Sequence, residues 1–411
     1  MSRLFSTLTI RSTTFVNRAW ISPMCQYSAV DGVVGPWHLV HLGSFAIGGA
    51  GLVMAEATAV APEGRISIGC PGLWNDAHVA AWRTVTDFVH AQGTTIGIQL
   101  AHAGRKGSSM LPWSDHAIAG PEDGGYETVA PSALAFPGYP TPRALTTDEC
   151  DGIPALFAEA AHRALEAGFD VLEIHAAHGY LLHEFLSPLS NERDDQYGGS
   201  FENRSRLLVA VVDAVRAVSA TAPLFVRLSA TDWTDGGWTI DDTVELVRVL
   251  AQRGVDLIDT SSGGNVVNAA IPVGPGYQVE LAERIGREVE IATNAVGMIT
   301  TGVQAEEILA SGHIQAVMVA RAAMRNPHWP MMAADELGDI IELRPSCCAL
   351  APNRSPNYYP IAWRNSRTKA STSAAVAPSR IRCTRAEPTM TPSLLRAACA
   401  ACSGVVMPIP T

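Results

Sequence analysis

Short apolar runs rich in β-branched residues recur along residues 20–335, and amphipathic segments separate them. Such runs are typical of strands that are buried on both faces of a parallel sheet. The predicted strands are 21–24, 51–57, 95–101, 170–176, 224–229, 255–261, 290–295 and 315–320. The predicted helices are 38–47, 78–92, 148–167, 201–219, 241–253, 278–285 and 304–310. Eight strands with a helix after most of them predict an α/β fold, the (β/α)8 TIM barrel.

The alternative architecture is a doubly wound open sheet. That fold requires a GxGxxG turn that opens a helix after the first strand, and the chain has no such turn there. Two connections, 102–147 and 261–277, are long and rich in small or turn-forming residues. Long loops in a compact domain are usually lids or subunit contacts, although plain surface coil has the same composition. We therefore predict a single barrel domain over residues 1–340.

The composition changes abruptly near residue 341. Residues 341–411 contain nine basic residues (Lys and Arg) and two acidic residues (Asp and Glu). Residues 1–340 contain 20 basic and 38 acidic residues. This basic segment is rich in Ser, Pro, Ala and Arg, shows no sustained apolar period, and is expected to be a disordered tail that does not pack. Its charges are scattered rather than clustered, which argues against an arm that binds nucleic acid or a membrane.

The overall composition excludes several classes of protein. The formal net charge of −11 argues against a nucleic-acid binder. Because the chain has neither a long continuous apolar run nor a signal sequence, we expect a cytoplasmic protein. Cys25, Cys70 and Cys150 are isolated along the chain, and the other cysteines follow residue 340 without the spacing of a metal site. The cysteines therefore predict neither a disulfide framework nor a zinc site.

Polar side chains with possible chemistry gather where the fourth predicted strand ends. The motif HAAHGY places His175, His178 and Tyr180 there, and Glu173 precedes them on the same strand. The histidines and the carboxylate could bind iron or zinc, the histidines could polarise a carbonyl oxygen, or the group could be structural. A tyrosine, with an ordinary pKa of about 10, suits proton donation to a strongly basic carbanion better than it suits a metal pocket.

Other predicted strands also end in candidate residues. A charged residue, Arg227, lies within an apolar strand and needs an anionic partner, for which a barrel carboxylate such as Glu173 is one possibility. Gly297 and Arg321 follow the last two strands, where loops often bind a phosphate, although a glycine there is equally typical of a plain turn. A lone thiol such as Cys25 is more often a small buried hydrophobic residue than a reactive group.

From about residue 3 to about residue 340 the chain resembles the Old Yellow Enzyme family of FMN-dependent oxidoreductases. It is most similar to the thermophilic-like bacterial class, which carries the cysteine of SPMC. The resemblance rests on motifs that occur in the same order and spacing: SPMCQYSA, EATAV, IGIQLAHAGRK, AGFDVLEIHAAHGYLLHEFLSPLSNERDDQYGGSFENR, FVRLSATD, GVDLIDTSSG and AVGMIT.

The resemblance implies that FMN lies across the barrel mouth. Arg227 would face N1 and O2 of the flavin, the backbone of Ala57 would lie near the O4 and N5 edge, and Gln99 would contact the pyrimidine ring. Arg321 and the backbone from Ala320 would bind the phosphate, although the family commonly has glycine in place of this alanine. The residues implied along the isoalloxazine ring are Ser22, Pro23, Met24 and Cys25.

The same resemblance implies an NAD(P)H-dependent ene-reductase that acts on activated alkenes such as enones or quinones. His175 and His178 would donate hydrogen bonds to the carbonyl oxygen of an α,β-unsaturated substrate, and Tyr27 would close the other side of the pocket. Tyr180 would supply the proton to the α-carbon, which makes it, with the two histidines and Cys25, the implied catalytic set. NADPH or NADH would donate the hydride.

The resemblance stops at about Asp339. Proteins of this class typically end soon after the last helix, with an arginine that reaches into the neighbouring subunit's site. The basic tail stands there instead, which leaves a homo-oligomer open. One alternative function is therefore a flavin-binding barrel with little turnover, because its C-terminus is altered. Another is a 2,4-dienoyl-CoA reductase, whose closely spaced iron–sulfur cysteines and further dinucleotide-binding region this chain does not match.

Overall fold

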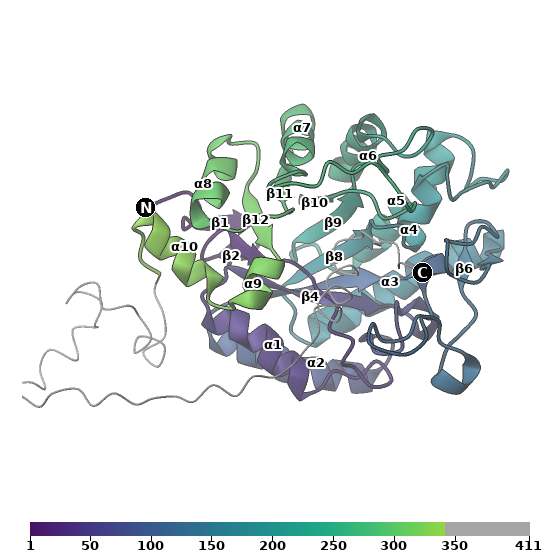
Figure 1. The fold of residues 1–411 in the computed structure, drawn as a ribbon, viewed down its shortest axis with the longest axis horizontal. Helices are drawn as coiled ribbons and strands as arrows, with labels where there is room; N and C mark the ends of the chain where they lie inside the picture. The colour runs from purple at the N-terminus through teal and green to yellow at the C-terminus, as the bar shows by residue number, and fades with distance from the viewer. Residues whose placement is uncertain (342–411) are drawn as a thin grey trace, which may run out of the picture.

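The computed structural model describes residues 1–341, and in it eight parallel strands close into a barrel that helices surround (Figure 1). The predicted (β/α)8 TIM barrel is therefore confirmed, while the predicted tail lies outside the described residues, apart from its first residue. In order around the barrel, the strands are β3 (Ala19–Ile21), β4 (Leu52–Ala59), β5 (Thr95–Ala101), β8 (Val171–Ala176), β9 (Leu224–Ser229), β10 (Leu257–Ser261), β11 (Ala292–Ala295) and β12 (Ala316–Val319).

The helices between these strands begin where polar side chains cap them. Asn75, Thr146, Ser200, Thr239 and Thr301 each accept a hydrogen bond from a backbone N–H of the first helical turn. The helices that alternate with strands are α1 (Pro36–Ile47), α2 (Asp76–Ala91), α3 (Thr147–Glu166), α5 (Phe201–Val218), α6 (Ile240–Gln252), α7 (Val279–Val289) and α8 (Gly302–Ala310).

The first predicted strand, 21–24, was placed too late in the chain. Ser22 N–H still donates to Val319 O at 3.1 Å, but Pro23 has no N–H and cannot continue the ladder. The strand therefore ends at Ile21, and the residues after it leave the sheet at the carboxyl end of the barrel.

Short elements add to the predicted set. Most of them are strands of two or three residues or helices of three to six residues, which contain too few positions to show a period in the sequence, and the longest is a nine-residue helix. They are β1 (Leu8–Ile10), β2 (Thr13–Phe15), η1 (Pro62–Gly64), η2 (Gly104–Lys106), η3 (Pro121–Asp123), β6 (Val129–Ala130), β7 (Arg143–Ala144), α4 (Leu181–Leu186), α9 (Arg321–Arg325) and α10 (Trp329–Leu337).

The two ends of the barrel differ in what fills them. At the amino ends of the strands, Phe15 from the β1–β2 hairpin packs against Trp20, with ring centroids 4.7 Å apart, and Trp20 stacks on Phe225. These aromatic rings close that end with apolar side chains. The polar candidate residues lie in the second halves of the strands or follow their carboxyl ends, where parallel barrels carry their chemistry. Over residues 1–341, no helix is long and apolar enough to cross a membrane.

Candidate active site at the carboxyl ends of the strands

Two adjoining cavities lie at the carboxyl ends of the barrel strands. The larger has a volume of about 150 Å³ and the smaller about 20 Å³, and both are lined by His178 and Arg227. They therefore form one site. A hollow of about 730 Å³ lies elsewhere, beside Met1 and Ile341, and contains none of the candidate residues.

Most of the residues that the sequence indicated meet in these two cavities. The side chain of Met24 instead packs into the hydrophobic core, and Tyr27 lies edge-on to Trp113 with ring centroids 6.1 Å apart, so neither residue lines the cavities. The lining includes Ser22, Pro23, Cys25, Ala57, Gln99, His175, His178, Tyr180, Arg227, Gly297, Ala320 and Arg321.

The two histidines form a buried pair at the end of β8. His178 Nδ1 lies 3.4 Å from His175 Nε2, and His178 Nε2 lies 2.6 Å from the Ser261 hydroxyl at the end of β10. Burial, with the nearby charge of Arg227, holds the pKa of both imidazoles well below its usual value. The rings are therefore neutral, and each has one N–H donor and one acceptor nitrogen. Ser261, which sequence reasoning missed, helps to set which nitrogen of His178 carries the hydrogen.

The backbone at His178 is unusual for a residue with a side chain. Its φ angle is +62°, in the left-handed region that glycine prefers. Gly179 follows it and approaches Gly264 so closely that an added Cβ would lie 2.4 Å from Gly264 O. The tight turn after β8 therefore depends on the loop that follows β10, and it aims the His178 ring into the site.

Tyr180 and Lys106 complete this side of the site. The Tyr180 ring centroid lies 5.2 Å from that of His175, and Lys106 Nζ lies 5.0 Å from the Tyr180 ring centroid. Lys106 Nζ also donates hydrogen bonds to His178 O at 2.7 Å and to Gly264 O at 2.9 Å. Burial, followed by the charge of Arg105, lowers the pKa of Lys106 to about 7. Lys106, which lies in the predicted connection 102–147, thus joins the turn after β8 to the loop after β10, a contact that the sequence does not indicate.

Arg227 is paired with Asp259 rather than with Glu173. Its Nε lies 3.3 Å from Asp259 Oδ2, because the register of β9 and β10 sets these two residues side by side. Its Nη1 donates to the Ser22 hydroxyl at 3.2 Å. Glu173 accepts from Gln99 Nε2 at 2.7 Å instead. Burial and the charge of Asp259 raise the pKa of Glu173 well above its usual value, so this carboxyl is neutral.

The far end of the larger cavity is strongly basic. Arg321 and Arg325 line it, whereas Arg227 lines both cavities, and the lining of the larger cavity contains no Asp or Glu. Within residues 1–341, neither Arg321 nor Arg325 forms an ion pair with a carboxylate. Gly297, with a φ angle of +125°, lines the same end after β11. Unneutralised guanidinium groups in a cavity attract an anion, so this end fits the phosphate of FMN.

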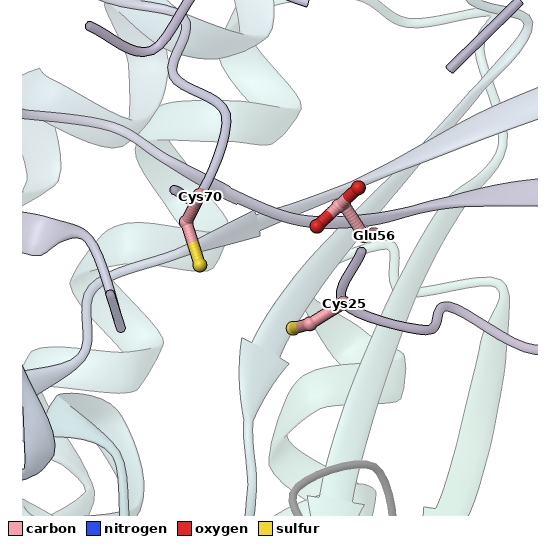
Figure 2. A group of neighbouring side chains, drawn as sticks. All are labelled: Cys25, Glu56 and Cys70. Atoms are coloured by element: carbon pink, nitrogen blue, oxygen red, sulfur yellow. The ribbon is translucent and has the colours of Figure 1, made fainter. Parts of the chain in front are cut away.

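Two cysteines that are isolated along the chain are neighbours in space. The sulfur atoms of Cys25 and Cys70 and a carboxylate oxygen of Glu56 all lie within 4.8 Å of one another (Figure 2). The sequence does not indicate that the two thiols meet, because 44 residues of chain lie between them. The HAAHGY histidines, by contrast, belong to no group of possible metal ligands within residues 1–341.

Comparison with known proteins agrees with this arrangement. Residues 3–339 match the NADH:flavin oxidoreductase / NADH oxidase family. An NADPH dehydrogenase of Geobacillus sp. (strain WCH70) is 50% identical over 341 residues, which cover 82% of this chain and 95% of that protein.

Solved structures are similar over the same region. Morphinone reductase in complex with tetrahydroNAD matches with a TM-score of 0.69 at 30% identity, over 84% of this chain and 93% of that one. An old yellow enzyme homologue from Zymomonas mobilis matches with a TM-score of 0.69 at 29% identity, over 84% of this chain and 95% of that one. The chain therefore belongs to the NADH:flavin oxidoreductase / NADH oxidase family, the Old Yellow Enzyme family, and is an oxidoreductase that uses FMN and NAD(P)H.

Proposed function

We propose that this oxidoreductase is an ene-reductase, which reduces the C=C bond of α,β-unsaturated carbonyl compounds. The observation that carries the proposal is the neutral pair His175 and His178 beside Tyr180, in a cavity that a buried arginine also lines. The similarity to morphinone reductase, at 30% identity, supports it.

The residues of the two cavities fit FMN in two parts. The guanidinium groups of Arg321 and Arg325, with the backbone around Gly297 and Ala320, would hold the phosphate. In the proposal, Arg227 and Ser22 face the electron-rich edge of the ring, where a fixed positive charge stabilises added negative charge. When bound, FMN accepts a hydride from NAD(P)H and passes a hydride to the alkene. The residues proposed along the ring are Pro23, Cys25, Ala57 and Gln99.

The histidine pair is proposed to hold the substrate's carbonyl oxygen. His175 Nδ1 is buried and has no hydrogen-bond partner within residues 1–341, so it can bind an incoming polar atom without breaking an internal bond. His175 donates from Nδ1 when His178 donates to its Nε2, and His178 reaches the oxygen by exchanging its bond to Ser261 or to His175. Each N–H that donates to the oxygen withdraws electron density from the conjugated alkene and makes its β-carbon electrophilic. Tyr27 lies outside the two cavities, so its implied role in closing the other side of the pocket stays a prediction.

Tyr180 is proposed to supply the proton to the α-carbon. Its position beside His175 brings the phenol to the place where the alkene would be held. A phenol remains protonated at neutral pH and yet protonates a strongly basic carbon readily. Tyr180 is therefore needed only when the alkene is reduced, and the two halves of the catalytic cycle should respond differently to its removal.

The test is Tyr180→Phe, measured by stopped-flow absorbance in each half-reaction under anaerobic conditions. We expect alkene reduction to slow by about 100-fold or more, because a general acid is lost, while flavin reduction by NADPH changes by less than about twofold. An equal loss in both half-reactions would show that Tyr180 is not the proton donor. A wild-type chain that binds FMN and oxidises NADPH but reduces no enone would overturn the proposal itself.

A further inference from the structure

Three side chains from separate segments lie together beside the active site (Figure 2), and one of them, Cys25, lines the smaller cavity. Cys25 follows β3, Glu56 lies on β4, and Cys70 lies in the loop that leads to α2. Their two sulfur atoms and one carboxylate oxygen all lie within 4.8 Å of one another. Among residues 1–341, this is the one group of three or more possible metal ligands.

The geometry points to a binding site for a thiophilic divalent cation of the zinc class, with Cys25, Cys70 and Glu56 as ligands. Two sulfurs and one carboxylate oxygen are donor types that Zn²⁺ prefers. With Zn–S bonds of about 2.3 Å and a Zn–O bond of about 2.1 Å, tetrahedral ligands lie roughly 3.5–3.8 Å apart. The three donor atoms lie within 4.8 Å of one another, so a metal ion would draw them together by at most about 1.3 Å to reach that spacing.

The surroundings of Glu56 hold its carboxylate in place. Gln26 N–H donates to Glu56 Oε2 at 2.8 Å, and His38 Nε2 lies 3.3 Å from Glu56 Oε1. His38 is 1% exposed, and its Nδ1 accepts from Gly35 N–H, which places the ring hydrogen on Nε2, toward Glu56. Ligands of metal ions in proteins are usually oriented by such an outer layer of hydrogen bonds.

The burial of the cysteines defines how a metal ion would reach the site. Cys70 is fully buried, whereas Cys25 is half-buried and lines the smaller active-site cavity with Ala57. The ion therefore enters from the cavity, each bound thiol releases its proton to solvent, and the fourth ligand position faces the cavity. Bound Zn²⁺ occupies space at the wall of the active site and inhibits the oxidoreductase. Metal binding does not require ene-reductase activity.

The experiment measures protection of each thiol from alkylation in the full chain, first with FMN removed so that the cavity beside Cys25 is open, and again with FMN bound. Zn²⁺ is titrated, the protein is treated with N-ethylmaleimide, and peptide mass spectrometry reports Cys25 separately from the cysteines after residue 341. We expect Zn²⁺ to slow alkylation of Cys25 by at least about tenfold. In Cys70→Ser, the same protection should need at least about tenfold more Zn²⁺, since a ligand is lost. Cys150→Ser, a buried thiol outside the group, is the matched control and should behave as wild type.

Glu56→Gln is the second variant, in case the serine variant does not fold, because an amide keeps the oxygen that accepts from Gln26 N–H. It should weaken protection of Cys25 as Cys70→Ser does. Equal alkylation of Cys25 with and without Zn²⁺ would overturn the inference. So would a Cys25 that is unreactive without metal and recovers with dithiothreitol, because that result would show a Cys25–Cys70 disulfide instead.

Discussion

Arg227 is a buried positive charge that lines both cavities at the barrel mouth. It is 5% exposed, and its one carboxylate partner within residues 1–341 is Asp259. Glu173 lies in the same buried group but is neutral, because burial and the charge of Asp259 raise its pKa. The group thus holds one positive and one negative charge, and a neutral acid can donate its hydrogen to the carboxylate beside it.

This arrangement predicts different effects for two isosteric substitutions. Asp259→Asn removes the carboxylate that pairs with Arg227, so the buried Glu173 must ionise to supply the counter-charge, and the variant should lower the free energy of unfolding by about 1–3 kcal/mol. Glu173→Gln keeps an oxygen that accepts from Gln99 and gains an N–H group that can donate to Asp259. This substitution should therefore change the free energy of unfolding by less than about 1 kcal/mol. Urea unfolding at neutral pH, without added FMN, measures both values. Equal losses in the two variants would mean that Glu173 carries a charge.

The identity of the partner of Arg227 could not be predicted from the sequence. An arginine inside LFVRLS shows that an anion must be near, and both Glu173 and Asp259 lie on strands of the same barrel. The choice between them depends on strand register, which pairs Arg227 with Asp259 on β10 and with His175 on β8. Register in a closed barrel is set by all of its strands together, so no local pattern contains it.

At the scale of elements, the sequence predicts best where an apolar run is bounded by residues that end a strand. β9 was predicted with its observed bounds, Leu224–Ser229, because Pro223 precedes the run and polar residues follow it. β3 was displaced because the apolar run continues through Met24, past the proline that ends the pairing. The β1–β2 hairpin and α9 were missed because they are shorter than the window in which a period can be recognised.

The loop after β10 is the element on which the geometry of His178 depends. Gly264 has a φ angle of +90°, and an added Cβ would lie 2.6 Å from His178 Cα. Gly264→Ala should therefore displace His178 and lower the free energy of unfolding by about 1–3 kcal/mol. Urea unfolding measures this loss, and the affinity for a phenol that occupies the carbonyl site reports the displacement of the ring.

The same loop offers a matched control. An added Cβ at Gly274 would meet only Pro272 O, at 4.0 Å, and Gly274 has no left-handed backbone. Gly274→Ala should therefore change stability by less than about 0.5 kcal/mol and leave phenol affinity unchanged. If Gly264→Ala also binds phenol as wild type does, the loop does not position His178.

At the scale of the whole molecule, the site was predictable because a parallel barrel collects the ends of all its strands at one mouth. His175, Arg227 and Arg321 are far apart in sequence, yet knowing the fold was enough to place them together. The contacts of Cys25 with Cys70, and of Lys106 with His178, were not predictable in this way. They depend on how long loops fold over the mouth, and loop sequences carry no period that fixes their path.

The opposite end of the barrel should affect stability without affecting FMN binding. Phe15 is fully buried and packs on Trp20 and Phe225 at the amino ends of the strands. Phe15→Ala removes this packing and should lower the free energy of unfolding by about 3–5 kcal/mol, while the folded fraction binds FMN with wild-type affinity. Urea unfolding and a fluorescence titration of FMN measure the two quantities.

Val16→Ala, at a neighbouring side chain that is 51% exposed, is the control and should change the free energy of unfolding by less than about 0.5 kcal/mol. Weaker FMN binding by folded Phe15→Ala would show that the two ends of the barrel are coupled.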